Sequence, residues 1–207
     1  MASTLDTHQP VSQDLPVLYI HPSRTSEWLP DIPSSLVKKL IDTGRVHPRL
    51  SQIVTQHYQL EPLPPFTGDI DHAIAMLDHG QLLEVVMAAG AIWHGRTLSR
   101  LIDKASLKAA LSLFGERTYR LAVAEAEFDP SSEADQTPTE LPPKEMLFED
   151  GKLCFLTWLR CLPVSLSKRV ELKFPPGMLT GSPSPAYATL GPDFVRKSGE
   201  AIIHAPE

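Results

Sequence analysis

Three aspartates and two histidines lie within the thirteen-residue segment GDIDHAIAMLDHG, residues 68–80. Carboxylate oxygens and imidazole nitrogens are common ligands of divalent metals, so the first question is whether this segment forms a metal site. Its apolar residues recur at helical spacing and predict an amphipathic helix that ends at Gly80. The geometry of that helix decides whether the polar residues can share an ion.

The predicted helix places the two histidines too far apart to bind one metal ion. His72 and His79 are seven residues apart, which corresponds to about 10 Å along the helix axis, whereas metal ligands lie within about 2.0–2.6 Å of the ion. Asp69 and His72 remain as a two-ligand fragment, without the second histidine four residues on that the helical zinc pattern needs. We favour solvated histidines on an acidic helix start. A metal-dependent enzyme that uses the Asp69/His72 region is the least favoured alternative.

Other catalytic patterns are absent from the sequence. It contains no GxGxxG, GxxxxGK[ST], GxSxG or HExxH motif, so no phosphate-binding loop, nucleophile elbow or zincin helix is predicted. Its two cysteines, Cys154 and Cys161, lie in the very apolar segment KLCFLTWLRCLP. A reactive thiolate needs a nearby base or positive charge, so both are predicted to be reduced and buried. We expect a protein that is not an enzyme and that has no catalytic residues, no cofactor and no bound metal.

The clearest candidate for binding is basic and follows Trp93 in WHGRTLSRLIDKASLK. Arg96, Arg100, Lys104 and Lys108 recur every four residues, which predicts a basic ridge if one helix continues through them. Such a ridge can recognise an acidic partner by electrostatic complementarity; the alternative is a solvated helix face of little energetic value. Trp93 falls at the register of predicted core residues, so it is either a core residue or an aromatic anchor for a partner.

Composition narrows the classes of partner. The chain has 207 residues, 42% of them hydrophobic, and a formal net charge of −6, which suits one domain with a real core. The acidic balance argues against nucleic-acid binding. The first residues lack the basic and apolar regions of a signal peptide, and the apolar run VVMAAGAIW is less than half a membrane span. We therefore expect a soluble cytosolic protein that binds other proteins and does not insert into a membrane.

The periodicity of the apolar residues is helical through most of the chain, and alternating β-branched runs are absent. We predict an all-α fold, a single-domain irregular helical bundle over residues 34–174. The expected helices include two short ones near residues 34–44 and 47–60, a nearly continuous series over 68–128, one through KLCFLTWLRC, and a short one after Pro163 that buries Leu166 and Val170.

Segments rich in proline, serine and glycine flank or interrupt this bundle. Residues 1–33 are predicted to form an extended N-terminal arm anchored by residues such as Tyr19 and Trp28. Residues 129–144 are acidic and too polar to bury much surface, which predicts a mobile loop. Residues 175–207 are predicted to be a flexible C-terminal tail.

Three blocks resemble the SctK (YscK) family of type III secretion systems. Residues 18–30, LYIHPSRTSEWLP, combine a Tyr-x-His-Pro start with Trp-Leu-Pro. Residues 88–126 form an Ala-rich segment that leads to Leu-Phe-Gly, and residues 154–175 contain a tryptophan and end in Leu-Lys-Phe-Pro. The order and spacing of the blocks cover most of the chain.

The resemblance implies a non-catalytic cytosolic adaptor of the injectisome's sorting platform, needed for assembly and secretion. Such an adaptor links the pods of SctQ to the cytoplasmic domain of the ring protein SctD, at the cytosolic face of the inner membrane, with SctL as a further candidate partner in the same platform. A cytosolic type III secretion chaperone is the alternative, and it would bind an unfolded effector segment instead of a folded domain. The family implies no particular site residues. The partner-binding candidates therefore come from the residues alone: Tyr19, Trp28, Trp93, Arg96, Arg100 and Lys104.

Overall fold

The regular secondary structure of the described part of the chain is all helical. The computed structural model describes residues 14–63, 65, 68–128 and 141–204, and within these ranges it contains no strand, which confirms the predicted all-α class. The elements in chain order are 3₁₀ helices η1 (Pro16–Leu18) and η2 (Pro22–Arg24), α1 (Thr25–Trp28), α2 (Ser34–Ile41), η3 (Gly44–Val46), α3 (His47–Tyr58), α4 (Ile70–Met76), α5 (His79–Trp93), α6 (Gly95–Ser99), α7 (Lys104–Ala124), η4 (Ala126–Phe128), α8 (Lys144–Cys161), α9 (Val164–Leu172) and α10 (Pro185–Ile203).

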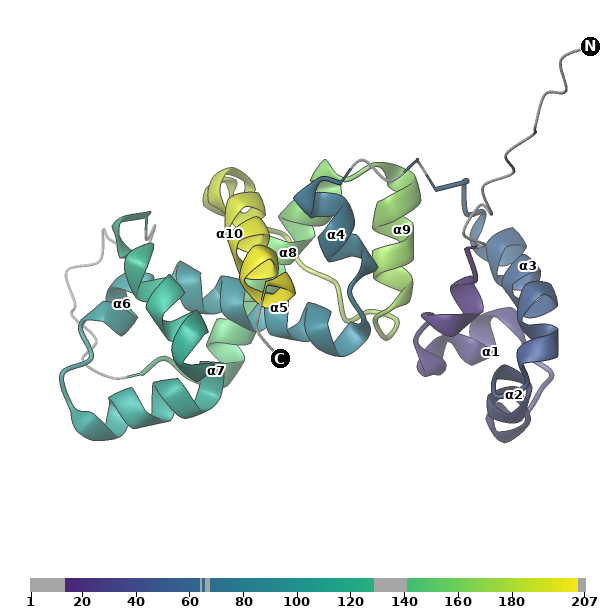
Figure 1. Ribbon diagram of the computed structural model, residues 1–207, viewed down its shortest axis with the longest axis horizontal. Helices are drawn as coiled ribbons and strands as arrows, with labels where there is room; N and C mark the ends of the chain where they lie inside the picture. Colours follow the sequence, from purple (N-terminus) through teal and green to yellow (C-terminus); the bar gives the residue numbers. More distant parts are fainter. Residues whose placement is uncertain (1–13, 64, 66–67, 129–140, 205–207) are drawn as a thin grey trace, which may run out of the picture.

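The helices enclose two hydrophobic cores that lie next to each other along the long axis of the molecule (Figure 1). We call residues 14–60, from η1 to α3, the N-terminal unit, and residues 69–204, from α4 to α10, the main bundle. The N-terminal unit has its own small core, to which α9 of the main bundle adds Leu172. The buried residues of that core are Val17, Ile20, Trp28, Val37, Leu50, Val54, Leu60 and Leu172.

The main bundle is organised around α5. Most of this helix is apolar on every side, and such a helix is stable only when other elements surround it; α7, α8 and α10 pack against it. Gly90 of α5 lets α8 approach so closely that a Cβ atom there would lie 1.8 Å from the carbonyl oxygen of Leu147. The helix starts at a capping box, in which Asp78 accepts from the N–H of Gln81 at 2.8 Å and the Gln81 side chain accepts from the N–H of Asp78 at 3.0 Å.

The predicted flexible C-terminal tail is wrong for residues 185–203, because they form α10. Pro185 occupies the first turn, where a missing N–H costs no hydrogen bond, so it helps to start the helix. Gly191 lies against α8, where a Cβ atom would be 2.9 Å from the Cα of Cys154. Phe194 and Val195 are 2% and 0% exposed in the main core. The residues that suggested flexibility thus start the helix and allow it to pack closely.

The predicted extended N-terminal arm is also wrong for residues 16–18 and 22–28, which form η1, η2 and α1. Of the predicted mobile loop at 129–144, residues 129–140 lie outside the described residues, and its last residue, Lys144, begins α8. The domain boundaries after residues 33 and 174 remain a prediction. Hydrophobic contacts do cross both positions, from α1 to α2 and from α10 to α8.

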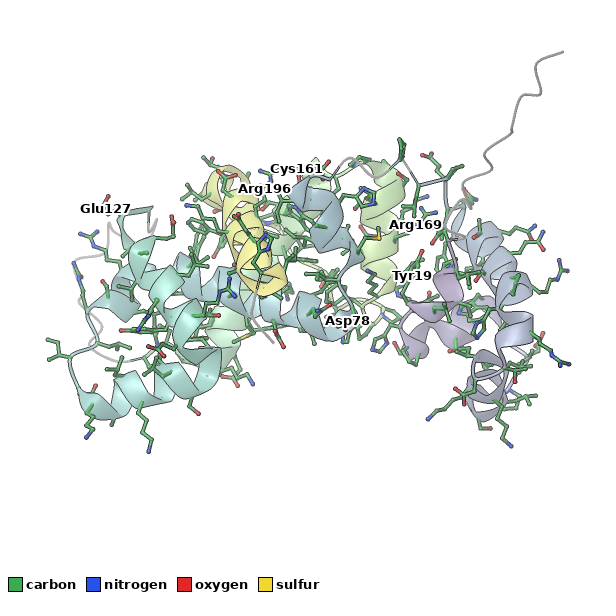
Figure 2. The ribbon with its side chains drawn as sticks, in the orientation of Figure 1. Tyr19, Asp78, Glu127, Cys161, Arg169 and Arg196 are labelled. Atoms are coloured by element: carbon green, nitrogen blue, oxygen red, sulfur yellow. The ribbon has the colours of Figure 1, made fainter. Side chains whose placement is uncertain are left out.

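Besides the packing of Leu172 in its core, the N-terminal unit makes polar contacts with α9 and the residues that follow it. The backbone N–H of His21 donates to the carbonyl of Leu172 at 2.8 Å, and the guanidinium of Arg24 donates to the carbonyl of Phe174 at 2.8 Å. Arg169 donates to one carboxylate oxygen of Asp14 through two nitrogens, at 2.8 and 2.6 Å. Figure 2 shows Arg169 and Tyr19 at this junction. The two units are therefore held together by specific hydrogen bonds.

Candidate partner-binding surfaces

The predicted basic ridge lies on two helices and the loop between them. α6 ends at Ser99 and α7 begins at Lys104, so the prediction of one continuous ridge is wrong. Asp103 causes the break, because its side chain accepts a 2.7 Å hydrogen bond from the backbone N–H of Ser106 and caps the new helix. Hydrogen bonding to Ser106 also lowers the pKa of Asp103, which keeps this cap ionised.

Basic residues nevertheless gather where the two helices meet, in a surface that we call the α6–α7 corner (residues 95–108). Leu98 and Leu101 bury themselves at 0% and 8% exposure and anchor the corner to the main core. Ile102, the next residue, is 88% exposed. With the cations around it, this side chain makes the corner a candidate surface for an acidic protein. The exposed cations of the corner are Arg96, Arg100, Lys104 and Lys108.

Tyr19 lies at the junction of the two units. Its hydroxyl donates to Asp14 at 3.0 Å, and the Lys173 ammonium lies 5.5 Å from the ring centroid. Burial and, after it, the charge of Asp14 raise the pKa of Tyr19. The ring also lines a cleft of about 440 Å³ between η1, the start of α5 and Lys173. Tyr19 therefore helps to hold the N-terminal unit against the main bundle, with part of its surface left accessible.

The two candidate tryptophans are buried. Trp28 is 4% exposed in the core of the N-terminal unit, and Trp93 is 7% exposed in the main core. Trp93 stacks on Tyr187 of α10, with ring centroids 3.8 Å apart and an interplanar angle of 9°. Their burial favours a role in packing, and neither ring is presented to a partner in this conformation.

The Asp/His segment forms the whole of α4 and the start of α5 in place of the single predicted helix. α4 ends at Met76, and Asp78 caps α5, so Gly80 lies in the first turn of α5 and does not end a helix. The predicted solvated His72 is wrong, since this residue is 6% exposed. Asp69 caps α4 by accepting from the N–H of His72 at 2.7 Å. Among the described residues, no group of three or more His, Cys, Asp or Glu side chains is placed to hold a metal ion.

Asp71 belongs to a polar network that the sequence pattern does not reveal. Its carboxylate accepts from the indole N–H of Trp158 at 2.9 Å and receives two hydrogen bonds from Arg196, at 2.9 and 3.0 Å. The network ties α4 to α8 and α10, and Figure 2 shows Arg196 on α10. The partners are 87 and 125 residues away in sequence, so no local signal predicts the contact. Its role is to position helices.

A second network contains a histidine and an aspartate, the pair that orients many catalytic bases. His94 donates to Asp150 at 2.6 Å, and the Tyr187 hydroxyl donates to the same carboxylate at 2.6 Å. Burial by itself raises the pKa of Asp150, but the hydrogen bonds from His94 and Tyr187 outweigh it and lower the pKa. The neighbouring thiol of Cys154 is fully buried, and this burial raises its pKa, which makes it a poor nucleophile. The network connects His94, the residue that follows α5, to α8 and α10.

Of the two cysteines that were predicted to be buried, only Cys154 is. Cys161, the last residue of α8, is exposed, and both are free thiols. Figure 2 shows Cys161 at the end of its helix. Cys154 and Cys161 are seven residues apart and lie on the same face of α8, so the exposure of Cys161 goes with its place at the end of the helix.

No helix in the described ranges is long and apolar enough to cross a membrane.

The model of the family described as YOP proteins translocation protein K (YscK) matches residues 9–189 of the chain. The nodulation protein NolU of Rhizobium fredii is 22% identical over 168 residues, which are 81% of this chain and 76% of that protein. NolU of Sinorhizobium fredii (strain NBRC 101917 / NGR234) matches to the same extent. No solved structure shows a significant match.

Proposed function

Because the chain belongs to the YscK family of type III secretion proteins, we propose that it is a non-catalytic adaptor of the injectisome. In this proposal it links the SctQ pods of the sorting platform to the cytoplasmic domain of the inner-membrane ring protein SctD, with SctL in the same assembly. It acts in the cytoplasm, docked at the inner face of the membrane-embedded apparatus. The family is a component of the secretion apparatus and not a known enzyme family, which agrees with this role.

The observation that carries the proposal is the α6–α7 corner. Arg96, Arg100 and Lys104 are exposed there beside Ile102, which is 88% exposed. A folded acidic partner would gain both charge complementarity and an apolar contact from this surface. The corner lies at the end of the molecule that is farthest from the N-terminal unit (Figure 1), so a partner bound there leaves that unit accessible to another protein.

The corner is tested by charge reversal in the purified full-length chain. Arg96→Glu combined with Arg100→Glu should weaken binding to either purified SctQ or the purified SctD cytoplasmic domain by about tenfold or more, and the difference should shrink at high salt. The matched control is Lys144→Glu combined with Arg160→Glu, two exposed cations on α8. Both variants should unfold at the same temperature as the wild type.

Three outcomes would decide against parts of this proposal. Equal binding by the corner variant and the control would remove the corner as a docking surface. Failure of the wild-type chain to bind either folded protein would remove the adaptor role. If the wild type bound an unfolded effector segment instead, the chaperone function would replace it.

A further inference from the structure

The opposite end of the molecule carries a second basic surface, formed by α2, η3 and the start of α3. We call residues 34–49 the α2–α3 corner. It contains Lys38, Lys39, Arg45 and Arg49 but one acidic residue, Asp42. The described residues as a whole contain 19 basic and 19 acidic side chains. The concentration of positive charge at this corner is therefore local and does not reflect the average of the protein.

Of the four cations of this corner, Arg49 donates a side-chain hydrogen bond to Gln52 at 2.7 Å within the described part of the chain. Lys38, Lys39 and Arg45 are exposed, and no salt bridge between described residues involves them. By contrast, Arg24 and Arg169 are committed to the junction between the two units, where both donate to groups of the other unit. Cations that do not hold the fold together remain available to another molecule.

An exposed apolar side chain accompanies this charge. Leu36 is 49% exposed, although its neighbour Val37 is 1% exposed in the core of the N-terminal unit. Leu36 and Lys39 are three residues apart on α2 and so lie on the same face. An exposed apolar side chain close to cations in the sequence occurs in the α6–α7 corner as well, where Ile102 takes the place of Leu36.

We propose that the α2–α3 corner is a second docking surface, which binds the acidic surface of a folded protein. An apolar recess of that partner receives the Leu36 side chain. This inference rests on the adaptor function, because it gives the molecule one basic corner for each of two partners. The two corners lie at opposite ends of the long axis (Figure 1). Two partners bound there would not overlap, which is what a linking protein requires.

An acidic protein fits this surface better than an anionic membrane does. Membrane-binding basic clusters generally combine four to eight Lys or Arg residues with either several inserting apolar side chains or a lipid anchor. Here Asp42 lies among four cations, and Leu36 is the single large apolar side chain of the corner that stands out as exposed among the described residues. Protein contacts combine an apolar centre with a polar rim, and Leu36 with the neighbouring cations has this arrangement.

The test uses the purified full-length chain with purified SctQ and the purified SctD cytoplasmic domain. Lys38→Glu combined with Lys39→Glu should weaken binding of one of them by about tenfold or more, and this should be the partner that the Arg96→Glu, Arg100→Glu variant still binds normally. Leu36→Ala should weaken binding of the same partner without changing how that binding depends on salt concentration. Lys38→Gln with Lys39→Gln replaces the glutamate variant if that one is less stable, and Lys144→Glu with Arg160→Glu is the control.

Each other result overturns the inference in a recognisable way. If the α2 variants bind both proteins as the wild type does, the second docking surface is refuted while the adaptor function stands. If both corner variants lose the same partner, the assignment of one corner to each partner is refuted. If the wild type binds neither protein, the adaptor function fails together with the inference. If the chain binds vesicles of phosphatidylcholine and phosphatidylserine, and the α2 variants lose this binding alone, the corner is a membrane surface.

Discussion

The substitution Gly90→Ala should strongly destabilise the main bundle. Gly90 lies where α5 crosses α8, and a Cβ atom on it would be 1.8 Å from the carbonyl oxygen of Leu147 and 3.1 Å from the backbone N of Gly151. Both of these are backbone atoms, which cannot rotate away as the end of a side chain can. The two helices must therefore separate, or the alanine cannot be accommodated.

The size of the effect follows from that distance. An ordinary contact needs about 3.4 Å, so α8 would have to move by about 1.5 Å, and a gap of only 0.5–1 Å already forfeits about a quarter to a half of each dispersion contact. Overpacked cores commonly lose about 1–3 kcal/mol. Because this contact separates two central helices, we expect a loss of about 3 kcal/mol or more, out of the roughly 5–15 kcal/mol that stabilises a typical protein. For a chain of this length, that corresponds to about 6–12 °C in Tm.

The measurement is urea unfolding followed by circular dichroism and by tryptophan fluorescence. Gly44→Ala is the matched control, since a Cβ atom there meets nothing within 4 Å and the residue has no positive φ. The control should change the free energy of unfolding by less than about 1 kcal/mol. A Gly90→Ala protein that is destabilised by no more than the control would refute the close crossing of α5 and α8.

Two further predictions concern the partly buried Asp71 and the buried Lys173. Asp71→Ala leaves the indole N–H of Trp158 without its acceptor and Arg196 without its main counter-ion, so the free energy of unfolding in urea should fall by about 2–4 kcal/mol. Asp193→Ala removes an exposed partner of Arg196 and should lower the free energy of unfolding by less than about 1 kcal/mol. Equal losses in the two variants would contradict the proposed network. Burial lowers the pKa of Lys173 to about 8, below the value of about 10.4 in an unfolded chain. The unfolded state therefore binds more protons between these values, and Lys173 makes the free energy of unfolding rise with pH from about 8 upward. Burial raises the pKa of Cys154, so this thiol makes the free energy of unfolding fall as the pH rises. The measurement is therefore the difference in the free energy of unfolding between the wild type and Lys173→Met at pH 7 to 9.5. A difference that does not change with pH would show that Lys173 titrates normally.

Local sequence patterns predicted most of the individual helices. The helices near residues 34–44 and 47–60 appear as α2 and α3, and the short helix after Pro163 is α9, with Leu166 and Val170 buried as expected. These predictions succeed because an apolar stripe at helical spacing must be buried wherever the helix finally packs. The membership of the family also followed from the order of three sequence blocks.

The errors arose where one residue can serve two structural purposes. Asp78 and Asp103 fit the polar face of a longer helix equally well, yet in the structure each caps a new one. Pro185 suggests an irregular tail and in fact starts α10. Which purpose a residue serves depends on the packing of the helix that follows, and a local window of sequence does not contain that information.

The sequence by itself determined that the protein is all-α and where most of its helices form, because helical periodicity and burial are properties of neighbouring residues. The tertiary structure alone decided which polar residues are used internally and which stay exposed without a salt bridge. Asp71 finds Trp158 and Arg196 at separations of 87 and 125 residues, whereas Lys38 and Lys39 form no salt bridge with the described residues. That distinction depends on contacts between distant segments, and such contacts exist only once the helices have packed.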